Sequence, residues 1–238
     1  MFRTFINQLL EVFYCSLCSL PLRGYLYLLL TCSMILLSME ENIMFDQLQD
    51  LFGVKPLRRC ALIGSRKAPS DILIMASTIG RVLSENRVVA HSGGAYGMDN
   101  AFMKYYDPDY RKIFIPNWKF YDHKHNGHDV IAWQTLEQKN LAMDELEHVY
   151  DNPRSIPLYM QNLFSRNVAQ VLGETLDDPV DCVLFWAKEV NGIVSGGTRI
   201  AVYVARRHGI PCFNLYHQEN RSAVEKILGG SDLSWLDI

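Results

Sequence analysis

The sequence has too few cysteines for a disulfide scaffold and is nearly balanced in charge, and each feature excludes a class of protein. Its 238 residues include six cysteines, most of them inside apolar runs, as at Cys60, Cys182 and Cys212. Such thiols are typical of reduced proteins and not of disulfide scaffolds, so we expect a cytoplasmic protein. Lysine and arginine number 23 against 26 acidic residues, a net charge of -3. This balance excludes a strongly basic nucleic-acid-coating protein, although a local basic groove is compatible with it.

Long apolar runs are also missing. The first 38 residues are rich in Leu, Phe and Tyr, but their longest charge-free run, residues 24–39, has 16 residues. A membrane-spanning helix needs about 20 apolar residues, so attachment to a membrane is not expected. The whole chain is 49% hydrophobic. This composition suits one well-buried domain and excludes disorder.

The apolar N-terminal stretch has three interpretations. It is a signal peptide or anchor, an amphipathic helical cap on the domain, or upstream sequence read in frame before a start at Met39 or Met44. We favour the third, because nothing after Met44 has the disulfide spacing of a secreted protein. The sequence therefore predicts an extension over residues 1–43 and a single domain over residues 44–238.

From residue 58 onward, short apolar runs alternate with helical patterns. Strands are expected at residues 60–64, 87–91, 112–116, 180–186 and 210–215, and helices at residues 71–84, 99–105, 131–150, 158–172 and 198–207. Ser70 is the expected N-cap of the first of these helices. Strands that alternate with helices imply parallel pairing. The prediction is an α/β fold: a doubly wound, Rossmann-like parallel sheet of about five strands with helices on both faces.

Three glycine-containing turns occur where a strand gives way to a helix. They are Gly64-Ser65-Arg66 (the first turn), Ser92–Gly97 (the second turn) and Ser195–Thr198 (the third turn). Such junctions share the carboxyl edge of a parallel sheet, where free helix N–H groups attract anions. We therefore expect the turns to hold a phosphate. No Walker lysine follows them and no strict G-x-G-x-x-G occurs, so neither ATP hydrolysis nor an NAD cofactor is predicted.

The order of these motifs resembles a known family. Residues 61–66, Ser92–Asp99, Ser165-Arg166-Asn167, Ser195–Thr198 and Ile210–Phe213 are similar to the Rossmann-like core of the DNA-processing protein A (DprA/Smf) group. That group shares the SLOG superfamily with the LOG phosphoribohydrolases. The resemblance implies binding of a nucleotide or of single-stranded DNA in recombination, and self-association of the chain. It covers about residues 58–216 and describes a stand-alone member of the kind found in phages and bacteria.

The sequence departs from both relatives. The DprA group usually carries further domains beside the core, and the net charge gives no obvious basic face for DNA. The LOG pattern places a glutamate after its glycine loop, whereas Arg199-Ile200-Ala201 follows the third turn here. The catalytic glutamate of LOG enzymes therefore has no counterpart in this chain.

Motifs and resemblance together give one set of candidate site residues. The expected nucleotide- or phosphate-binding residues are Gly64, Ser65, Arg66, Ser92, Gly93, Gly94, Ala95, Gly97, Met98, Asp99, Arg166, Asn167, Trp186, Ser195, Gly196, Gly197 and Thr198. If the protein cleaves an N-glycosidic bond, Asp99 and Glu189 are the candidate catalytic carboxylates, because such cleavage needs an acid near the sugar. The alternatives are a helix-capping role for Asp99 and a solvated loop position for Glu189.

A histidine-rich loop follows the third expected strand. His123, His125 and His128, with Asp122 and Asp129, suit either a polar lid over the crevice or, less well, a divalent metal site. Their spacing matches no established ligand pattern, so we predict no metal and no cofactor. Three functions remain open: nucleotide binding or sensing, nucleotide N-glycosidase activity, and single-stranded DNA binding.

Overall fold

The computed structural model describes residues 42–133 and 136–229. The three interpretations of the N-terminal stretch concern residues that lie almost entirely outside the described ranges. Among the described helices, none has both the length and the apolar character needed to cross a membrane. Residues 42–52 are helical, and their Leu48 and Phe52 belong to the core.

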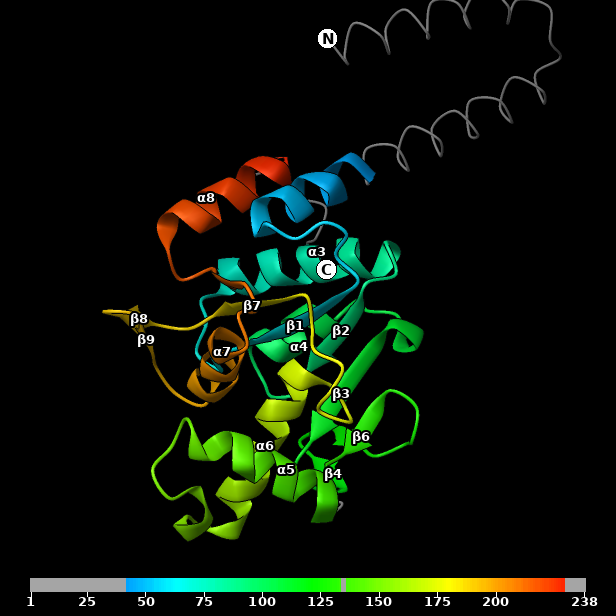
Figure 1. Ribbon diagram of the computed structural model, residues 1–238. Coiled ribbons are helices and arrows are strands. Elements are labelled where there is room, and N and C mark those ends of the chain that lie inside the picture. The colour runs from blue at the N-terminus through cyan, green and yellow to red at the C-terminus, as the bar shows by residue number, and fades with distance from the viewer. Residues whose placement is uncertain (1–41, 134–135, 230–238) are drawn as a thin grey trace, which may run out of the picture. The chain divides into compact units, whose positions relative to one another are not determined.

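A six-stranded parallel sheet forms the centre of the fold (Figure 1). In spatial order its strands are β10 (Cys212–Asn214), β7 (Cys182–Trp186), β1 (Arg59–Gly64), β2 (Val89–Ser92), β3 (Arg111–Ile115) and β6 (Val130–Ala132). The predicted doubly wound α/β fold is confirmed. The predicted count of about five strands missed β6, whose last two residues were expected to begin a helix.

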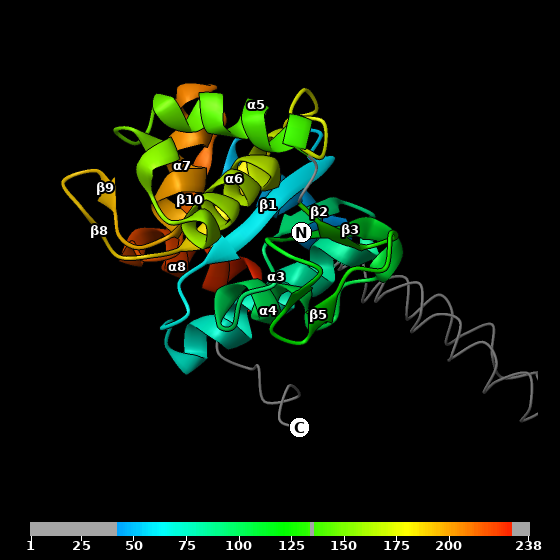
Figure 2. The same ribbon diagram turned by 90° about the horizontal axis from the view of Figure 1, so that it is seen from below.

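Helices cover both faces of the sheet, as Figure 2 shows from below. One layer contains α3 (Ser70–Glu85), α4 (Met98–Met103) and α8 (Gln218–Ile227), and the other contains α5 (Leu136–Glu147), α6 (Leu158–Leu172) and α7 (Thr198–Arg207). Successive residues of β1 serve opposite layers, because side chains alternate along a strand: Cys60 and Leu62 face the first, Ala61 and Ile63 the second.

Short elements complete the chain. Two antiparallel hairpins, β4 (Lys119–Phe120) with β5 (His123–Lys124) and β8 (Glu189–Val190) with β9 (Ile193–Val194), lie outside the main sheet, and single 3₁₀ turns span Pro108–Tyr110 and Pro153–Ser155. The predicted helix over residues 131–150 is wrong at its start, since β6 occupies Val130–Ala132. The predicted N-cap is also wrong: Ser70 is the first residue of α3, and Pro69 precedes it without a side-chain cap.

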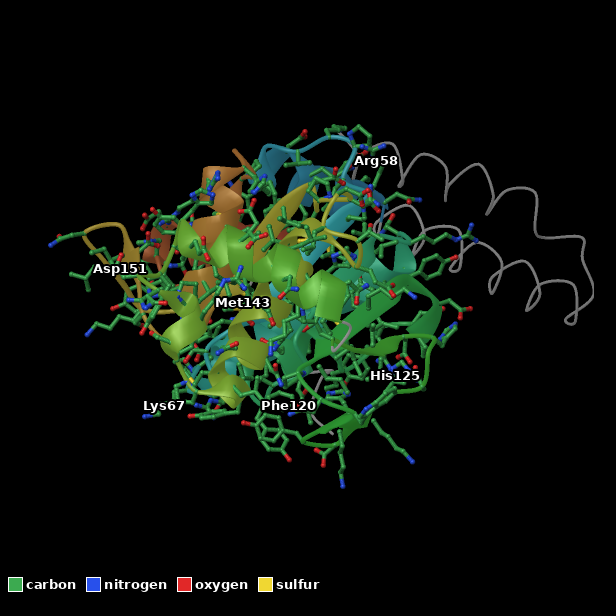
Figure 3. All side chains as sticks on the ribbon, turned by 60° about the horizontal axis from the view of Figure 1, so that its bottom comes forward. Arg58, Lys67, Phe120, His125, Met143 and Asp151 are labelled. Carbon is green, nitrogen blue, oxygen red and sulfur yellow. The ribbon has the colours of Figure 1, made fainter. Side chains whose placement is uncertain are left out.

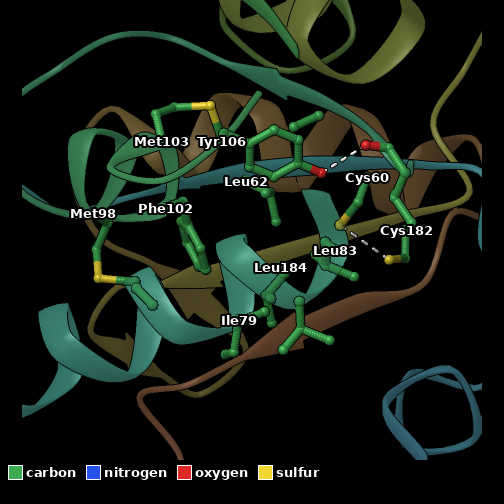
Figure 4. Packing of buried hydrophobic residues seen from close by; sticks show 14 of the residues in the cluster. Cys60, Leu62, Ile79, Leu83, Met98, Phe102, Met103, Tyr106, Cys182 and Leu184 are labelled. Carbon is green, nitrogen blue, oxygen red and sulfur yellow. Dashed lines mark hydrogen bonds between the residues drawn. The ribbon is translucent and has the colours of Figure 1, made fainter. Parts of the chain in front are cut away.

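The first core layer shows how closely α3 and α4 pack. This layer contains Leu83, Phe102, Leu184 and the free thiols of Cys60 and Cys182, whose sulfurs are 3.3 Å apart across β1 and β7 (Figure 4). Gly80 of α3 faces the backbone of α4: a Cβ atom there would lie 2.0 Å from the carbonyl oxygen of Phe102. Only glycine therefore permits this helix contact, which sets the position of α4 and of Asp99 at its start.

Candidate functional site

The strand order reverses between β1 and β7, so the crevice of a doubly wound sheet is expected there. Gly64 and Trp186, the last residues of the two strands, are partners in the register. The Ser65 N–H donates to the Trp186 carbonyl at 2.8 Å, and the Ser195 N–H donates to the Lys188 carbonyl at 2.9 Å. The first and third turns therefore flank the same short segment, residues 186–188.

Asp99 joins the first turn to the second. Its Oδ1 accepts a hydrogen bond from the Gly64 N–H at 3.0 Å, and its Oδ2 accepts from the N–H groups of Gly93 and Ala95 at 3.2 and 3.3 Å. The side chain is 4% exposed. Amides that were expected to surround a ligand anion thus surround an anion of the protein itself.

The burial of Asp99 also changes its acidity. Burial raises the pKa of the carboxyl from 3.8 to about 6 and outweighs the opposing effects of the Arg166 charge and of the three amides. Neither oxygen is free of backbone partners. The geometry gives Asp99 a connecting role between the turns, whereas its catalytic role stays a prediction.

Arg166 fixes the second turn from the side of α6. Its guanidinium lies against Gly93, where a Cβ atom would be 1.5 Å from Nη1, so a larger residue at position 93 would displace the guanidinium from this contact. Its Nη1 donates to the side-chain oxygen of Gln170, given the amide orientation that satisfies both groups. Its Cζ lies 5.4 Å from the ring centroid of Phe120, a cation–π distance. Arg166 is 6% exposed, and its Nε has no hydrogen-bond partner in the described part of the chain.

Asn167 makes the equivalent contact with the third turn. Its Nδ2 donates to the Gly197 carbonyl at 3.2 Å. Arg166 and Asn167 both lie past the middle of α6. From that place two adjacent residues reach two different turns, so the Arg-Asn pair holds the second and third turns together.

The third turn differs from the other two in being open. Ser195, Gly196 and Gly197 are exposed, and a Cβ atom on either glycine would meet nothing within 4 Å. Within residues 136–229 and 42–133, no hydrogen-bond acceptor faces the N–H groups of Gly196, Gly197 or Thr198. They lie at the start of α7, where the helix dipole adds positive potential. This turn therefore has the amides that are available to an external anion.

Other predicted residues have packing roles in the second turn. Ser92 is fully buried, and its hydroxyl donates to the Leu62 carbonyl at 2.9 Å, which links β2 to β1. Gly93 and Gly94 are buried as well, Ala95 and Gly97 are half-buried, and Met98 belongs to the core. The side chains of Ser92 and Met98 are therefore not presented to solvent.

The β4–β5 hairpin packs on the second turn through aromatic and polar contacts. The Tyr121 ring lies 4.3 Å from the Tyr96 ring, and its hydroxyl accepts a hydrogen bond from Arg66 Nη1 at 3.2 Å. Tyr96 in turn donates to Asp122 at 3.1 Å. The hairpin, marked by Phe120 in Figure 3, therefore covers the second turn and connects it to the first.

The three histidines of this region have separate partners. His123 bonds Asn100 at 3.2 Å, His125 bonds the Val130 carbonyl at 3.0 Å, and His128 pairs with Asp109 at 3.3 Å. In the described ranges, no group of three or more His, Cys, Asp or Glu residues is placed to hold a metal ion. The geometry thus offers no support for the metal alternative.

Glu189 is held by three donors. Its carboxylate accepts hydrogen bonds from Arg206 at 2.6 Å, Asn214 at 2.8 Å and His217 at 3.1 Å. Burial acts to raise the pKa of Glu189, but these three hydrogen bonds outweigh it and hold the pKa at about 2. The side chain is 8% exposed, so the solvated-loop alternative is wrong.

Sequence reasoning missed His217 in this cluster. The signal that could have found it is its position, since it lies three residues after the end of β10 and so belongs to the same carboxyl edge as the turns. Trp186 lies nearby at the end of β7, half-buried, with its ring 5.7 Å from the ring of Tyr216.

A groove of about 1050 Å³ lies along α7, away from the switch point. Its lining includes Arg199, Arg206 and Arg207 together with Tyr150 and Tyr203. Since Arg199 belongs to the first turn of α7, the groove begins next to the third turn. This groove and the predicted site are therefore neighbours and not the same place.

These features define a class of protein: a doubly wound, Rossmann-like α/β domain with linked glycine turns at its switch point. No protein-family profile matches the sequence, and no curated protein matches it. Among solved structures, the chain is similar to DNA processing protein A from Helicobacter pylori, studied for its single-stranded DNA binding mode. The two share 18% identity over 74% of each chain, with a TM-score of 0.43. The functional argument therefore depends on the site residues.

Proposed function

We propose that the protein binds a nucleotide or nucleoside phosphate at the carboxyl edge between β1 and β7. The observation that carries the proposal is the contrast between the turns: Asp99 occupies the amides of the first and second, whereas the amides of the third are open. The phosphate is assigned to the third turn, with the hydroxyl groups of Ser195 and Thr198. Arg66, exposed on the first turn, supplies a cation.

The position of Trp186 supports a place for the base. Its carbonyl anchors the first turn, and its half-buried ring lies at the end of β7, between that turn and the residues that lead to the third. An indole at this edge offers a face for stacking. The ligand class that combines a phosphate with a planar ring is a nucleotide.

Replacing Thr198 by glutamate tests this assignment. A carboxylate in the first turn of α7 interacts favourably with the helix dipole, so we expect Thr198→Glu to fold. Its negative charge would repel a bound phosphate. We expect the affinity for AMP, CMP, GMP or UMP, measured by titration calorimetry, to fall at least tenfold in Thr198→Glu. In Arg66→Ala we expect about a tenfold loss, the size of one charge-assisted hydrogen bond.

The matched control is Arg58→Ala. Arg58 precedes β1 at the opposite edge of the sheet, where it pairs with Asp181, and its removal is expected to leave nucleotide affinity unchanged. Absence of binding by all four nucleotides, or equal affinity in Thr198→Glu and the unchanged protein, would contradict the proposal.

Single-stranded DNA binding is a second candidate, favoured by the surface around the β4–β5 hairpin. Trp118, whose ring contacts His125 beside the hairpin, is 62% exposed, and Tyr96 of the second turn, whose ring contacts Tyr121 of the hairpin, is 45% exposed. Exposed cations accompany these rings at Arg66, Lys67, Lys119 and Lys124. Aromatic rings among cations are what single strands require, since bases stack and phosphates pair with charge.

The hairpin surface gives a direct test with a labelled oligothymidine. We expect Trp118→Ala to lower affinity about tenfold in fluorescence anisotropy, because one stacked base contributes roughly 1–3 kcal/mol. Tyr159→Ala, which removes an equally exposed ring from α6, is expected to have no effect. Affinity should also fall steeply as salt rises. Equal losses in the two variants would refute this second function.

A further inference from the structure

The groove along α7 combines exposed apolar side chains with cations. Arg199, Tyr203 and Arg206 are spaced four and three residues apart, so they project from one face of the helix. Val202 and Ile193 add aliphatic side chains to the lining. Ile193 is 65% exposed and Tyr203 is 48% exposed. Apolar side chains that gather in one hollow, with polar groups at its rim, indicate a binding surface.

The lining of the groove carries more positive than negative charge. It includes three arginines and a single acid, Asp151. The charge of Arg206 is balanced by Glu189, which lies 2.6 Å away. Arg199, in contrast, is exposed and forms no ion pair with any of the residues that the structure describes. The groove therefore favours an occupant that is both apolar and acidic.

The size of the groove suits a peptide. Its volume of about 1050 Å³ lies at the upper limit of small-molecule pockets, which range over roughly 300–1,000 Å³. Its walls come from three separate segments: residues 148–151, residues 192–194 and α7. A groove that follows one helix face, with apolar positions three and four residues apart, accommodates several side chains of a bound segment.

Residues 230–238 have the chemistry that this groove requires. They lie outside the described ranges, and their sequence contains two acids and no lysine or arginine. The acids are Asp232 and Asp237, and the large apolar residues are Leu233, Trp235, Leu236 and Ile238. Tryptophan is enriched among the residues that dominate the binding energy of interfaces, so the segment has a suitable anchor.

The groove and the end of α8 belong to different layers of the fold. Leu228, the residue after α8, packs against the first layer, whereas Val194 and Val202 of the groove belong to the second. Nine extended residues span at most about 30 Å. A path around the edge strand β10 from one layer to the other uses much of that length. A segment from another copy of the chain meets no such limit.

We propose that the α7 groove binds residues 230–238 of a second copy of this chain. In this pairing Arg199 balances an aspartate of the segment, and Trp235 covers the exposed side chains of Ile193 and Tyr203. A symmetric pair forms when each copy donates its segment to the groove of the other. The pairing is independent of the proposed function, since it uses none of the residues assigned to the nucleotide.

Charge reversal tests the pairing in the full chain. Analytical ultracentrifugation without nucleotide is expected to show dimers of the unchanged protein at about 10–100 µM. In Arg199→Glu, and in the double variant Asp232→Lys/Asp237→Lys, we expect association to weaken at least about tenfold, because like charges then meet. Combining all three substitutions should restore part of the association, since opposite charges are paired again. A variant that had merely lost its fold would show no such recovery.

Apolar variants and a distant cation complete the test. Trp235→Ala is expected to weaken association at least about tenfold, and an excess of a synthetic peptide of residues 230–238 is expected to dissociate the dimers. Lys104→Glu, which reverses an exposed charge at the end of α4 in the first layer, should leave association unchanged. A chain that stays monomeric at about 100 µM would overturn the proposal. Dimers that persist at full strength in both Arg199→Glu and Trp235→Ala would do the same.

Discussion

An Asp99→Asn variant is expected to lose about 2 kcal/mol of unfolding free energy between pH 7 and pH 5, whereas the unchanged protein loses only about 0.5 kcal/mol. Two buried groups with opposite pKa shifts cause the difference. Burial lowers the pKa of His91 from 6.5 to about 4, and burial raises the pKa of Asp99 from 3.8 to about 6.

The two groups respond to acid in opposite senses. Below pH 6.5 the unfolded chain protonates His91 while the folded chain does not, so falling pH favours unfolding. Asp99 takes up a proton in the folded chain near pH 6, before the unfolded chain does near pH 3.8, so its contribution to stability grows as pH falls. In the unchanged protein the two effects largely cancel. Asparagine at position 99 removes only the second.

Urea unfolding at pH 7, 6 and 5 measures this difference. The comparison concerns the slope against pH, so a constant loss caused by the substitution itself does not affect it. Glu189 does not interfere, since its pKa of about 2 makes it lose stability only below its unfolded value of 4.5. Parallel pH profiles for Asp99→Asn and the unchanged protein would show that the Asp99 carboxyl keeps an ordinary acidity.

A Gly80→Ala variant is expected to lose about 3 kcal/mol of unfolding free energy. In an unobstructed helix this change would stabilise by about 1 kcal/mol, because alanine has the higher helix propensity. Here the added Cβ would lie 2.0 Å from the Phe102 carbonyl oxygen and 2.9 Å from its carbon. Backbone atoms cannot turn away as a side chain does, so α3 and α4 must separate.

A helix-propensity effect would raise the free energy of unfolding and a packing clash would lower it, so the sign of the change distinguishes the two. Urea midpoints for Gly80→Ala and for Asp71→Ala, an exposed position on the same helix, separate a helix-propensity effect from a packing effect. Asp71→Ala should change stability by less than about 0.5 kcal/mol. A Gly80→Ala protein as stable as the unchanged one would mean that the two helices are not in the close contact described.

The regular elements were predictable because their patterns are long and their ends are marked. Residues 158–172 and 198–207 were predicted as helices and are helices at those bounds. Among the elements that were not predicted in their place are β6 and α8. The strand β6 has three residues between a polar loop and a helix, too few for an alternating pattern, and α8 is largely polar with one fully buried side chain, Val224.

The turns were located by sequence, but their partners were not. The amide of Gly64 bonds a carboxylate 35 positions away, and no local pattern distinguishes that arrangement from Asp99 capping its own helix. Likewise the spacing of Glu189 and His217 carries no signal, since the pair forms only when β10 lies beside β7. Contacts between distant segments depend on the packed sheet, which is why the sequence located the turns but not the carboxylate of Asp99 that accepts hydrogen bonds from two of them.

Arg166 contacts the second turn and Asn167 contacts the third, and the two are consecutive residues of one helix, α6. A small rotation of α6 about its own axis would displace both side chains together. The second and third turns, which contact these two side chains, are therefore expected to shift together when α6 rotates.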